Sequence, residues 1–249
     1  MAWFLNSSKP DWLTPDWLSE ILGSDLAARL SVRSHPRARR VSLRVDSQAG
    51  VIVLVRPRRA SEKFIAAFVA EKKSWIAKHA AQLDALPGET SVADGMTISL
   101  FGEAVTVRHA GQSRAGVWRE GDILYVSGRA EHLARRVRDW LKAEARRELT
   151  QIAREFAAVI ERKVARVGVR DTRSRWGSCN AKGEISLSWR LILAPADVAR
   201  YVVAHEVSHL KHLDHSPAFW RTVAELCPGR ENARAWLKRN GAALHRVVV

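Results

Sequence analysis

Cysteine is scarce in this sequence, which has only Cys179 and Cys227 among its 249 residues. Two thiols cannot build a disulfide framework or a zinc site held by cysteines alone. Long hydrophobic runs are also missing, and Val51 to Val55 is far shorter than the roughly 18 residues needed to cross a bilayer. Met1 to Pro10 has no cationic segment followed by an apolar stretch, so we expect no secretory signal. These absences predict a protein of the reducing cytoplasm with no membrane partner.

Acidic residues are in the minority, because 26 Asp and Glu stand against 41 Lys and Arg, a net charge of +15. The arginines gather in three clusters that could neutralise phosphates: residues 37–44, 56–59 and 135–138. Nucleic acid is therefore one candidate partner, and a solvated arginine-rich surface is the other interpretation. No helix-turn-helix, zinc-finger or RNP-type signature accompanies the charge. Charge of this kind governs association rather than mechanism.

Hydrophobic residues make up 47% of the chain, which is enough for a core and excludes a disordered protein. Alternating apolar residues predict a hairpin of residues 41–45 and 51–55, and the period then changes to that of a helix from Ser61 to Pro87. Short strands are expected at 96–100, 105–107 and 123–126.

The second half of the sequence reads as mainly helical. Apolar residues at helical spacing run from Leu133 to Val164 and predict a long helix, straight or kinked, that ends near Gly168. Strands are expected at 169–173 and 184–189, joined by the segment 176–183. Pro195 and Asp197 then open another helix.

That last helix contains the run His205-Glu206-Val207-Ser208-His209. Residues four apart share a helix face, so both imidazoles can point at one metal ion with Glu206 beside them. Two neutral histidines hold zinc without cancelling its charge, and the carboxylate can accept a proton from an attacking water. The alternative is a helix with hydrogen-bonded histidines and no metal.

A tetrahedral zinc site needs a third protein ligand, and His212 and His215 compete for that place. His212 lies on the same helical face as His205, but it would approach the ion from nearly the same direction as His209. His215 stands before Ser216-Pro217, where the chain leaves the helix and a Ser N-cap with Pro at N1 starts another. The turn can bring His215 back over the ion, so we favour His215.

Beyond the histidines, a longer series of residues resembles the YgjP-like metallopeptidase family, a zincin group related to the SprT-like proteases. The resemblance is specific over about residues 170 to 240 and absent from the first 30 or so. It is carried by Arg175-Trp176-Gly177-Ser178-Cys179, Gly183, Trp189-Arg190-Leu191, Pro195, Tyr201 through Glu206, His209-Leu210, His215-Ser216 and Phe219-Trp220.

The resemblance implies one zinc ion per chain, held by His205, His209 and His215, with Glu206 as catalytic base. It also implies that the segment from Trp176 to Ser178 leads into strands beside the active-site cleft. The sequence departs from the family at Ser188, where members commonly carry Asn.

Other side chains are weaker candidates. A donor opposite the metal would stabilise the transition state, and Asp214 or Glu225 could orient the ligand imidazoles. Cys179 could ligate or react, although a lone cysteine near a tight turn is usually packing. The candidates for substrate or transition-state contacts are Arg173, Arg175, Trp176, Gly177, Ser178, Tyr201 and His212.

The sequence as a whole predicts an α+β fold in three parts: an N-terminal extension (1–30), a strand-rich region (31–128) and a helical zincin-like catalytic region with a small sheet (129–249). The leading hypothesis for function is a zinc-dependent hydrolase, a metallopeptidase acting on a peptide or protein. One alternative is hydrolysis of a nucleotide phosphoanhydride, since the arginine excess suits an anionic substrate. The other is a DNA-associated module that cleaves DNA-bound proteins, as the resemblance to SprT-like proteases implies.

Overall fold

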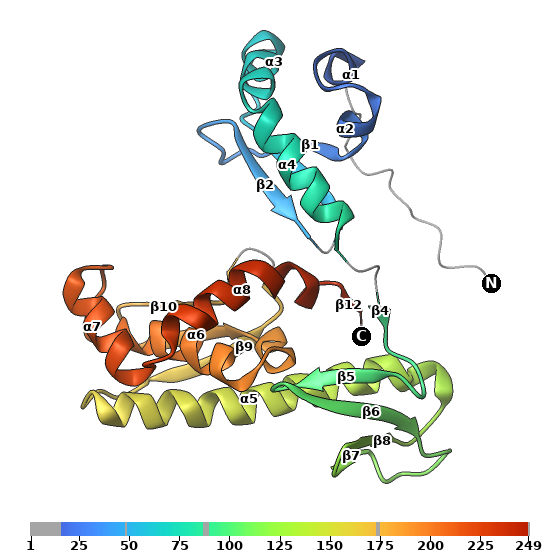
Figure 1. The fold of residues 1–249 in the computed structure, drawn as a ribbon, viewed down its shortest axis with the longest axis vertical. Helices are drawn as coiled ribbons and strands as arrows, with labels where there is room; N and C mark the ends of the chain where they lie inside the picture. Colours follow the sequence, from blue (N-terminus) through green and yellow to red (C-terminus); the bar gives the residue numbers. More distant parts are fainter. Residues whose placement is uncertain (1–15, 48, 87–89, 173–174, 249) are drawn as a thin grey trace. The chain divides into compact units, whose positions relative to one another are not determined.

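The structure, a computed structural model, describes residues 16–47, 49–86, 90–172 and 175–248. The chain forms two compact units, Met1–Leu86 and Pro87–Val249. This division differs from the boundaries that the sequence suggests after residues 30 and 128. The three regions that those boundaries define stay a prediction. Together the elements make an α+β fold with small mixed sheets, as the sequence predicts (Figure 1).

The N-terminal unit is a three-stranded sheet with helices. Its central strand β3 pairs in parallel with β1 and antiparallel with β2, and the β2–β3 hairpin is the one that the sequence predicts. The helix expected from Ser61 is two helices, α3 and α4, separated at Lys72. The elements are α1 (Asp16–Leu22), α2 (Ser24–Ala28), β1 (Leu30–Ser34), β2 (Ser42–Asp46), β3 (Val51–Arg56), α3 (Glu62–Glu71) and α4 (Lys73–Asp84).

The C-terminal unit begins with a four-stranded sheet in the order β5-β6-β8-β7. A strand pair, β4 (Thr90–Ser91) with β12 (Val247–Val248), joins the two ends of this unit. The sheet is built from β5 (Thr97–Leu100), β6 (Glu103–His109), β7 (Val117–Glu120) and β8 (Ile123–Val126), and a 3-10 turn (Ala130–His132) follows it.

The rest of this unit packs around the long helix α5 (Leu133–Val159), whose apolar stripe lies in the core. A three-stranded sheet in the order β10-β11-β9 and three further helices complete it. These elements are β9 (Arg166–Arg170), β10 (Gly177–Cys179), β11 (Glu184–Ser188), a 3-10 helix (Trp189–Leu193), α6 (Ala196–Ser208), α7 (Pro217–Leu226) and α8 (Arg230–Leu244).

Three expectations about this region need correction. The strand expected at 169–173 is β9, which begins at Arg166 and ends at Arg170, where its pairing with β11 ends. The long helix ends at Val159, because Glu161 takes a left-handed conformation with φ of 55° and the chain reverses. Ile160 and Val164 continue the apolar spacing because they pack against the core, not because the helix continues. The segment 176–183 also contains a strand, β10, whose three residues are too few to show alternation in a sequence.

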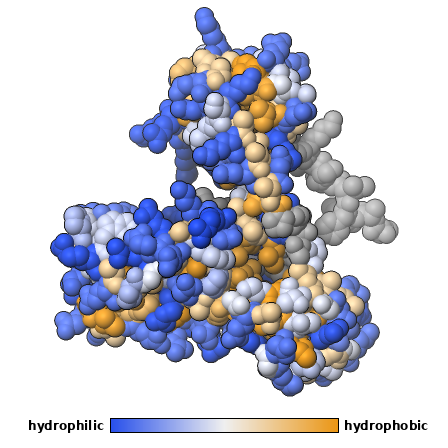
Figure 2. All heavy atoms as spheres, viewed as in Figure 1, coloured by the Kyte–Doolittle hydropathy of each residue, from blue (hydrophilic) through white to orange (hydrophobic). Residues whose placement is uncertain are grey.

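The surfaces follow the composition. Hydrophilic residues cover much of the visible face of each unit (Figure 2). Apolar residues fill the two cores. Within the described residues, no helix has the length and apolar character needed to cross a membrane.

Candidate metal centre

Helix α6 carries the first two histidines into the core of the C-terminal unit. His205 lies on its last turns and His209 is its C-cap residue, so the two rings are one helical turn apart. Their ring centroids lie 5.2 Å apart. The helix is buried along most of its length, which fixes these side chains on a rigid element.

A short turn then brings a third histidine back over the helix. Ser216 is the N-cap of α7 and accepts a hydrogen bond from the N–H of Phe219, and Pro217 follows at the first helical position, as the sequence predicts. The Nε2 atoms of His215 and His205 lie 3.2 Å apart. One ligand atom from each of His205, His209 and His215 lies within 4.8 Å of the others. His212, the rival third ligand, is not part of this cluster.

The three imidazoles fit a zinc ion. Two ligand nitrogens at 2.0–2.1 Å from a tetrahedral ion are about 3.3 Å apart, close to the separation of His205 and His215. The Nδ1 of His209 lies 2.9 Å from the backbone carbonyl oxygen of His212, a contact in which Nδ1–H donates and Nε2 keeps its lone pair for a metal. Burial, with the charges of His209 and His215, lowers the pKa of His205 to about 4, which favours the neutral imidazole that metals require.

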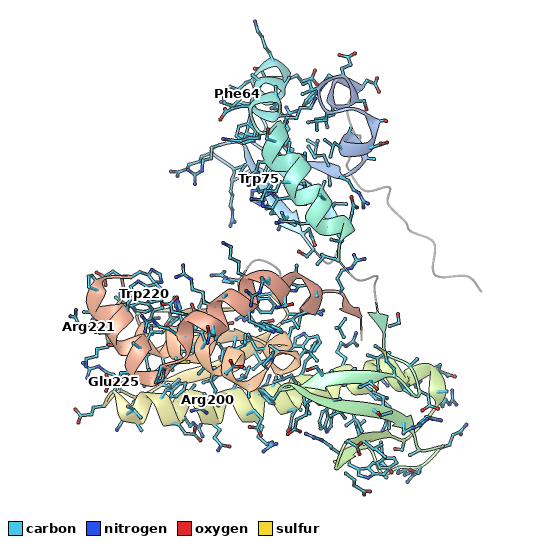
Figure 3. The ribbon with its side chains drawn as sticks, in the orientation of Figure 1. Phe64, Trp75, Arg200, Trp220, Arg221 and Glu225 are labelled. Atoms are coloured by element: carbon cyan, nitrogen blue, oxygen red, sulfur yellow. The ribbon has the colours of Figure 1, made fainter. Side chains whose placement is uncertain are left out.

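Aromatic rings of α7 hold the histidines in place. Phe219 is fully buried, and its ring centroid lies 4.9 Å from that of His205, 4.6 Å from His209 and 4.8 Å from His215. Trp220, labelled on α7 in Figure 3, adds a side wall at 5.8 Å from His205 and 6.0 Å from His215. A single element therefore backs all three imidazoles at once.

Glu206 projects from α6 toward strand β10 and is only 6% exposed. A Cβ atom placed on Gly177 would lie 2.5 Å from Cγ of Glu206 and 2.6 Å from Oε1, distances that no side chain tolerates. The glycine therefore makes the room in which the carboxyl group lies. Burial raises the pKa of Glu206 to about 7, against the opposing effect of the positive charge of Arg175. A carboxyl group of that pKa can both accept and release a proton near neutral pH.

A buried arginine organises the segment that leads into β10. Arg190, 2% exposed, donates to both carboxylate oxygens of Asp171, at 2.8 and 3.4 Å, and to the carbonyl oxygens of Leu244 and Val247, both at 2.8 Å. It thereby ties the end of β9 to the C-terminal end of the chain. The contact satisfies the charge of a guanidinium that burial would otherwise make costly.

The structure places the weaker candidates in several different positions. Arg173 lies outside the described residues. Arg175 is exposed and acts on Glu206 through its charge, and Trp176 stacks on His245 with ring centroids 4.8 Å apart. Ser178 lines an open cavity on the face of the β9–β11 sheet.

Tyr201 and His212 play supporting parts in the geometry. Tyr201 is 7% exposed and meets His205 edge-on, with ring centroids 6.4 Å apart, and burial raises the pKa of its phenol. His212 contributes its backbone carbonyl rather than its ring. This carbonyl group orients a ligand imidazole, the role for which the sequence suggests Asp214 or Glu225. Asp214 instead accepts a hydrogen bond from the N–H of Ser216 at 3.3 Å.

Two other residues near the site are Ser188, where the sequence departs from the family, and Arg234, which no sequence motif indicates. Ser188 is fully buried, and its N–H donates to the carbonyl oxygen of Trp176, so it supports the segment before β10. Arg234, on α8, lies over the Trp220 ring at 5.7 Å, and its charge helps to lower the pKa of His205. Nothing in the sequence relates Arg234 to a motif that lies far before it in the chain.

A family model described as "YgjP-like, metallopeptidase domain" matches residues 39–240. The chain belongs to the YgjP-like metallopeptidase family. The match contains every residue of the imidazole cluster together with Glu206, and it extends into the N-terminal unit. The family resemblance predicted from the sequence is thus confirmed.

Other comparisons add little. One similar solved structure is the crystal structure of the metallopeptidase zymogen of Pyrococcus abyssi abylysin, whose sequence is 25% identical to this one. The match covers 41% of this chain and 99% of the abylysin chain, with a TM-score of 0.34. No curated protein matches the chain.

Proposed function

We propose that this protein is a zinc-dependent peptidase in which His205, His209 and His215 hold the metal and Glu206 is the catalytic base. The observation that carries the proposal is the buried carboxyl group of Glu206. This residue directly follows His205 in the sequence, and the imidazole of His205 converges with those of His209 and His215. Membership of a metallopeptidase family supports the same chemistry. All four residues lie in the region 129–249, which we propose as the catalytic region.

A zinc ion, when bound, supplies Lewis-acid chemistry, because it polarises a carbonyl group and lowers the pKa of water. Glu206 then takes the proton from the attacking water and delivers it to the leaving nitrogen. Its pKa of about 7 suits both halves of that transfer. The hydrogen bond between His209 and the carbonyl oxygen of His212 holds one ligand ring in the tautomer that binds the metal.

The test separates metal binding from turnover. We expect purified protein to contain about one zinc per chain, to lose it in the His205→Ala variant and to keep it in Glu206→Gln. Peptide-bond cleavage in a mixture of unstructured peptides should disappear in both variants. A folded, fully active protein without metal would contradict the proposal.

Product analysis decides between substrate classes. Release of phosphate or pyrophosphate from nucleoside triphosphates, abolished by Glu206→Gln and unaccompanied by peptide cleavage, would replace the peptidase assignment with nucleotide hydrolysis. The scarcity of cysteine supports a reducing location such as the cytoplasm for this activity.

A further inference from the structure

Two cavities meet at the β10–β11 hairpin, and both are lined by cations. The hairpin cavity, about 390 Å³, reaches the metal-site residue His209 and is lined by Arg162, Lys163, Lys182 and Lys211 among others. The sheet-face cavity, about 550 Å³, lies on the β9–β11 sheet and is lined by Arg146, Arg166, Arg170 and Arg175 among others. Asn180, in the hairpin, lines both cavities, so the two cavities adjoin each other.

The charge of this surface is strongly one-sided. Of the residues that the structure describes, those lining the hairpin cavity include no carboxylate, and those lining the sheet-face cavity include only Glu184, which accepts a hydrogen bond from Asn180 at 2.7 Å. In the described part of the chain, none of the eight cations forms an ion pair. Like charges held this close repel one another, and a ligand that brings negative charge relieves the repulsion.

The floor of the sheet-face cavity is flat. Ser178, Ser186 and Gly168 lie side by side across the three strands, since the register pairs Ser178 with Ser186 and Ser186 with Gly168. All three side chains are small, so an extended chain can lie across them between the arginines. Guanidinium groups bind carboxylates through paired hydrogen bonds.

The position of the cavities favours a polypeptide over a nucleic acid. The hairpin cavity touches His209, and the sheet-face cavity is lined by Ser178 and Cys179 of strand β10, whose Gly177 contacts Glu206. A chain bound in these cavities therefore lies next to residues of the proposed site. Among the described residues, neither lining includes Phe, Tyr or Trp, the platforms on which unpaired bases stack.

We propose that the hairpin and sheet-face cavities bind Asp and Glu side chains of the polypeptide substrate, so that the enzyme selects acidic segments next to the scissile bond. This inference rests on the proposed peptidase function. The hairpin cavity, next to His209, takes the acidic residue nearest the cleaved bond, and the sheet-face cavity takes those farther away. Cleavage should therefore slow as salt rises, because salt screens exposed charge.

Binding is measured first, apart from turnover. The zinc-loaded Glu206→Gln protein is titrated against a fluorescein-labelled Glu-rich peptide and against the same peptide with Gln in place of Glu. We expect the Glu peptide to bind at least about tenfold more tightly at about 50 mM salt, and Lys182→Glu or Arg170→Glu in that background to remove the difference. Arg114→Glu is the matched control, because Arg114 is exposed between β6 and β7 and lines neither cavity.

Cleavage of a peptide mixture by the otherwise wild-type enzyme then gives the specificity. We expect Asp and Glu to be enriched around the cleaved bonds, Lys182→Glu to reverse the preference toward Lys and Arg, and Arg114→Glu to leave it unchanged. Zinc content confirms that each variant keeps its site.

The outcomes separate the two proposals. Peptide cleavage without an acidic preference, or a preference that survives Lys182→Glu and Arg170→Glu, overturns this inference and leaves the peptidase function standing. Absence of cleavage with charge-selective binding overturns the peptidase function, and of this inference it leaves only the binding of acidic peptides. Equal binding of the two peptides, or tight binding of single-stranded DNA or RNA that the same variants abolish, shows that the cavities serve another ligand.

Discussion

The carboxyl group of Glu206 occupies the space in which a side chain at Gly177 would begin, since a Cβ at that position would lie 2.5 Å from Cγ of Glu206. Strand β10 and helix α6 thus pack closely where a glycine meets the proposed base. We expect Gly177→Ala to displace Glu206 and to lower kcat at least about tenfold while zinc stays bound.

Gly229→Ala is the control for that change, because no atom lies within 4 Å of the Cβ it would introduce. It should keep wild-type kcat. Full activity of Gly177→Ala would contradict this role of Gly177, because Glu206 could then move aside without loss of function.

The choice between His215 and His212 gives a second prediction. The His215→Ala variant should lose zinc, because one of three converging imidazoles is removed. The His212→Ala variant should keep zinc, because His212 supports the site through its backbone carbonyl, which the substitution preserves. Metal content after dialysis against a weak chelator measures both, and zinc loss from His212→Ala alone would reverse the assignment.

Phe219 links stability to metal affinity. Truncation to Ala leaves a cavity beneath all three imidazoles and should lower the free energy of unfolding by about 3–5 kcal/mol. Phe219→Leu keeps most of the volume and should cost less, while both weaken zinc binding because the rings lose their backing. Urea unfolding of the metal-free proteins isolates the first effect, and zinc titration the second. Unchanged zinc affinity in Phe219→Ala would contradict the role of this ring.

Cys179 should react slowly with alkylating reagents. Burial first, and the charge of Glu206 second, raise the pKa of its thiol to about 11. The thiolate is the reactive form, so the rate at pH 8 should be about a thousandth of its limit and should rise about tenfold per pH unit below that pKa. Glu206→Gln removes one cause and should speed the reaction. Mass spectrometry that resolves Cys179 from Cys227 follows the rates, and a rate that levels off near pH 8 would be the contrary result.

Asp171 should make the protein sensitive to acid. Burial pushes the pKa of this carboxyl group up, but the hydrogen bond and charge of Arg190 outweigh it, and the pKa lies below the ordinary value of 3.8. The native state therefore favours the carboxylate, so the stabilisation is present above pH 3.8 and is lost as the pH falls through the lowered pKa. Urea midpoints should place Asp171→Asn below the wild type at pH 7, with the gap closing in acid. A gap that stays constant down to pH 2 would contradict this linkage.

The sequence by itself predicted strands at 51–55 and 123–126, the start of α6 and the Ser216-Pro217 start of α7, because these depend on alternation, helical period and capping within a few residues. It also determined the ligand types, since a pair of histidines four apart on a helix can converge on one ion wherever that helix lies. The sequence did not predict strand β10 or the residue at which α5 ends. Three residues show no period, and apolar spacing past Val159 reflects packing against the core.

Only the tertiary structure decided what surrounds the imidazoles. Phe219 backs three rings, Gly177 makes room for Glu206, and Arg190 binds both Asp171 and Leu244, contacts between residues that lie as much as 54 positions apart in the chain. Local patterns carry no information about such pairs, because their proximity depends on how helices and strands pack. The +15 charge shows the same division: composition gives its size, while the fold gathers eight cations around one hairpin beside the site.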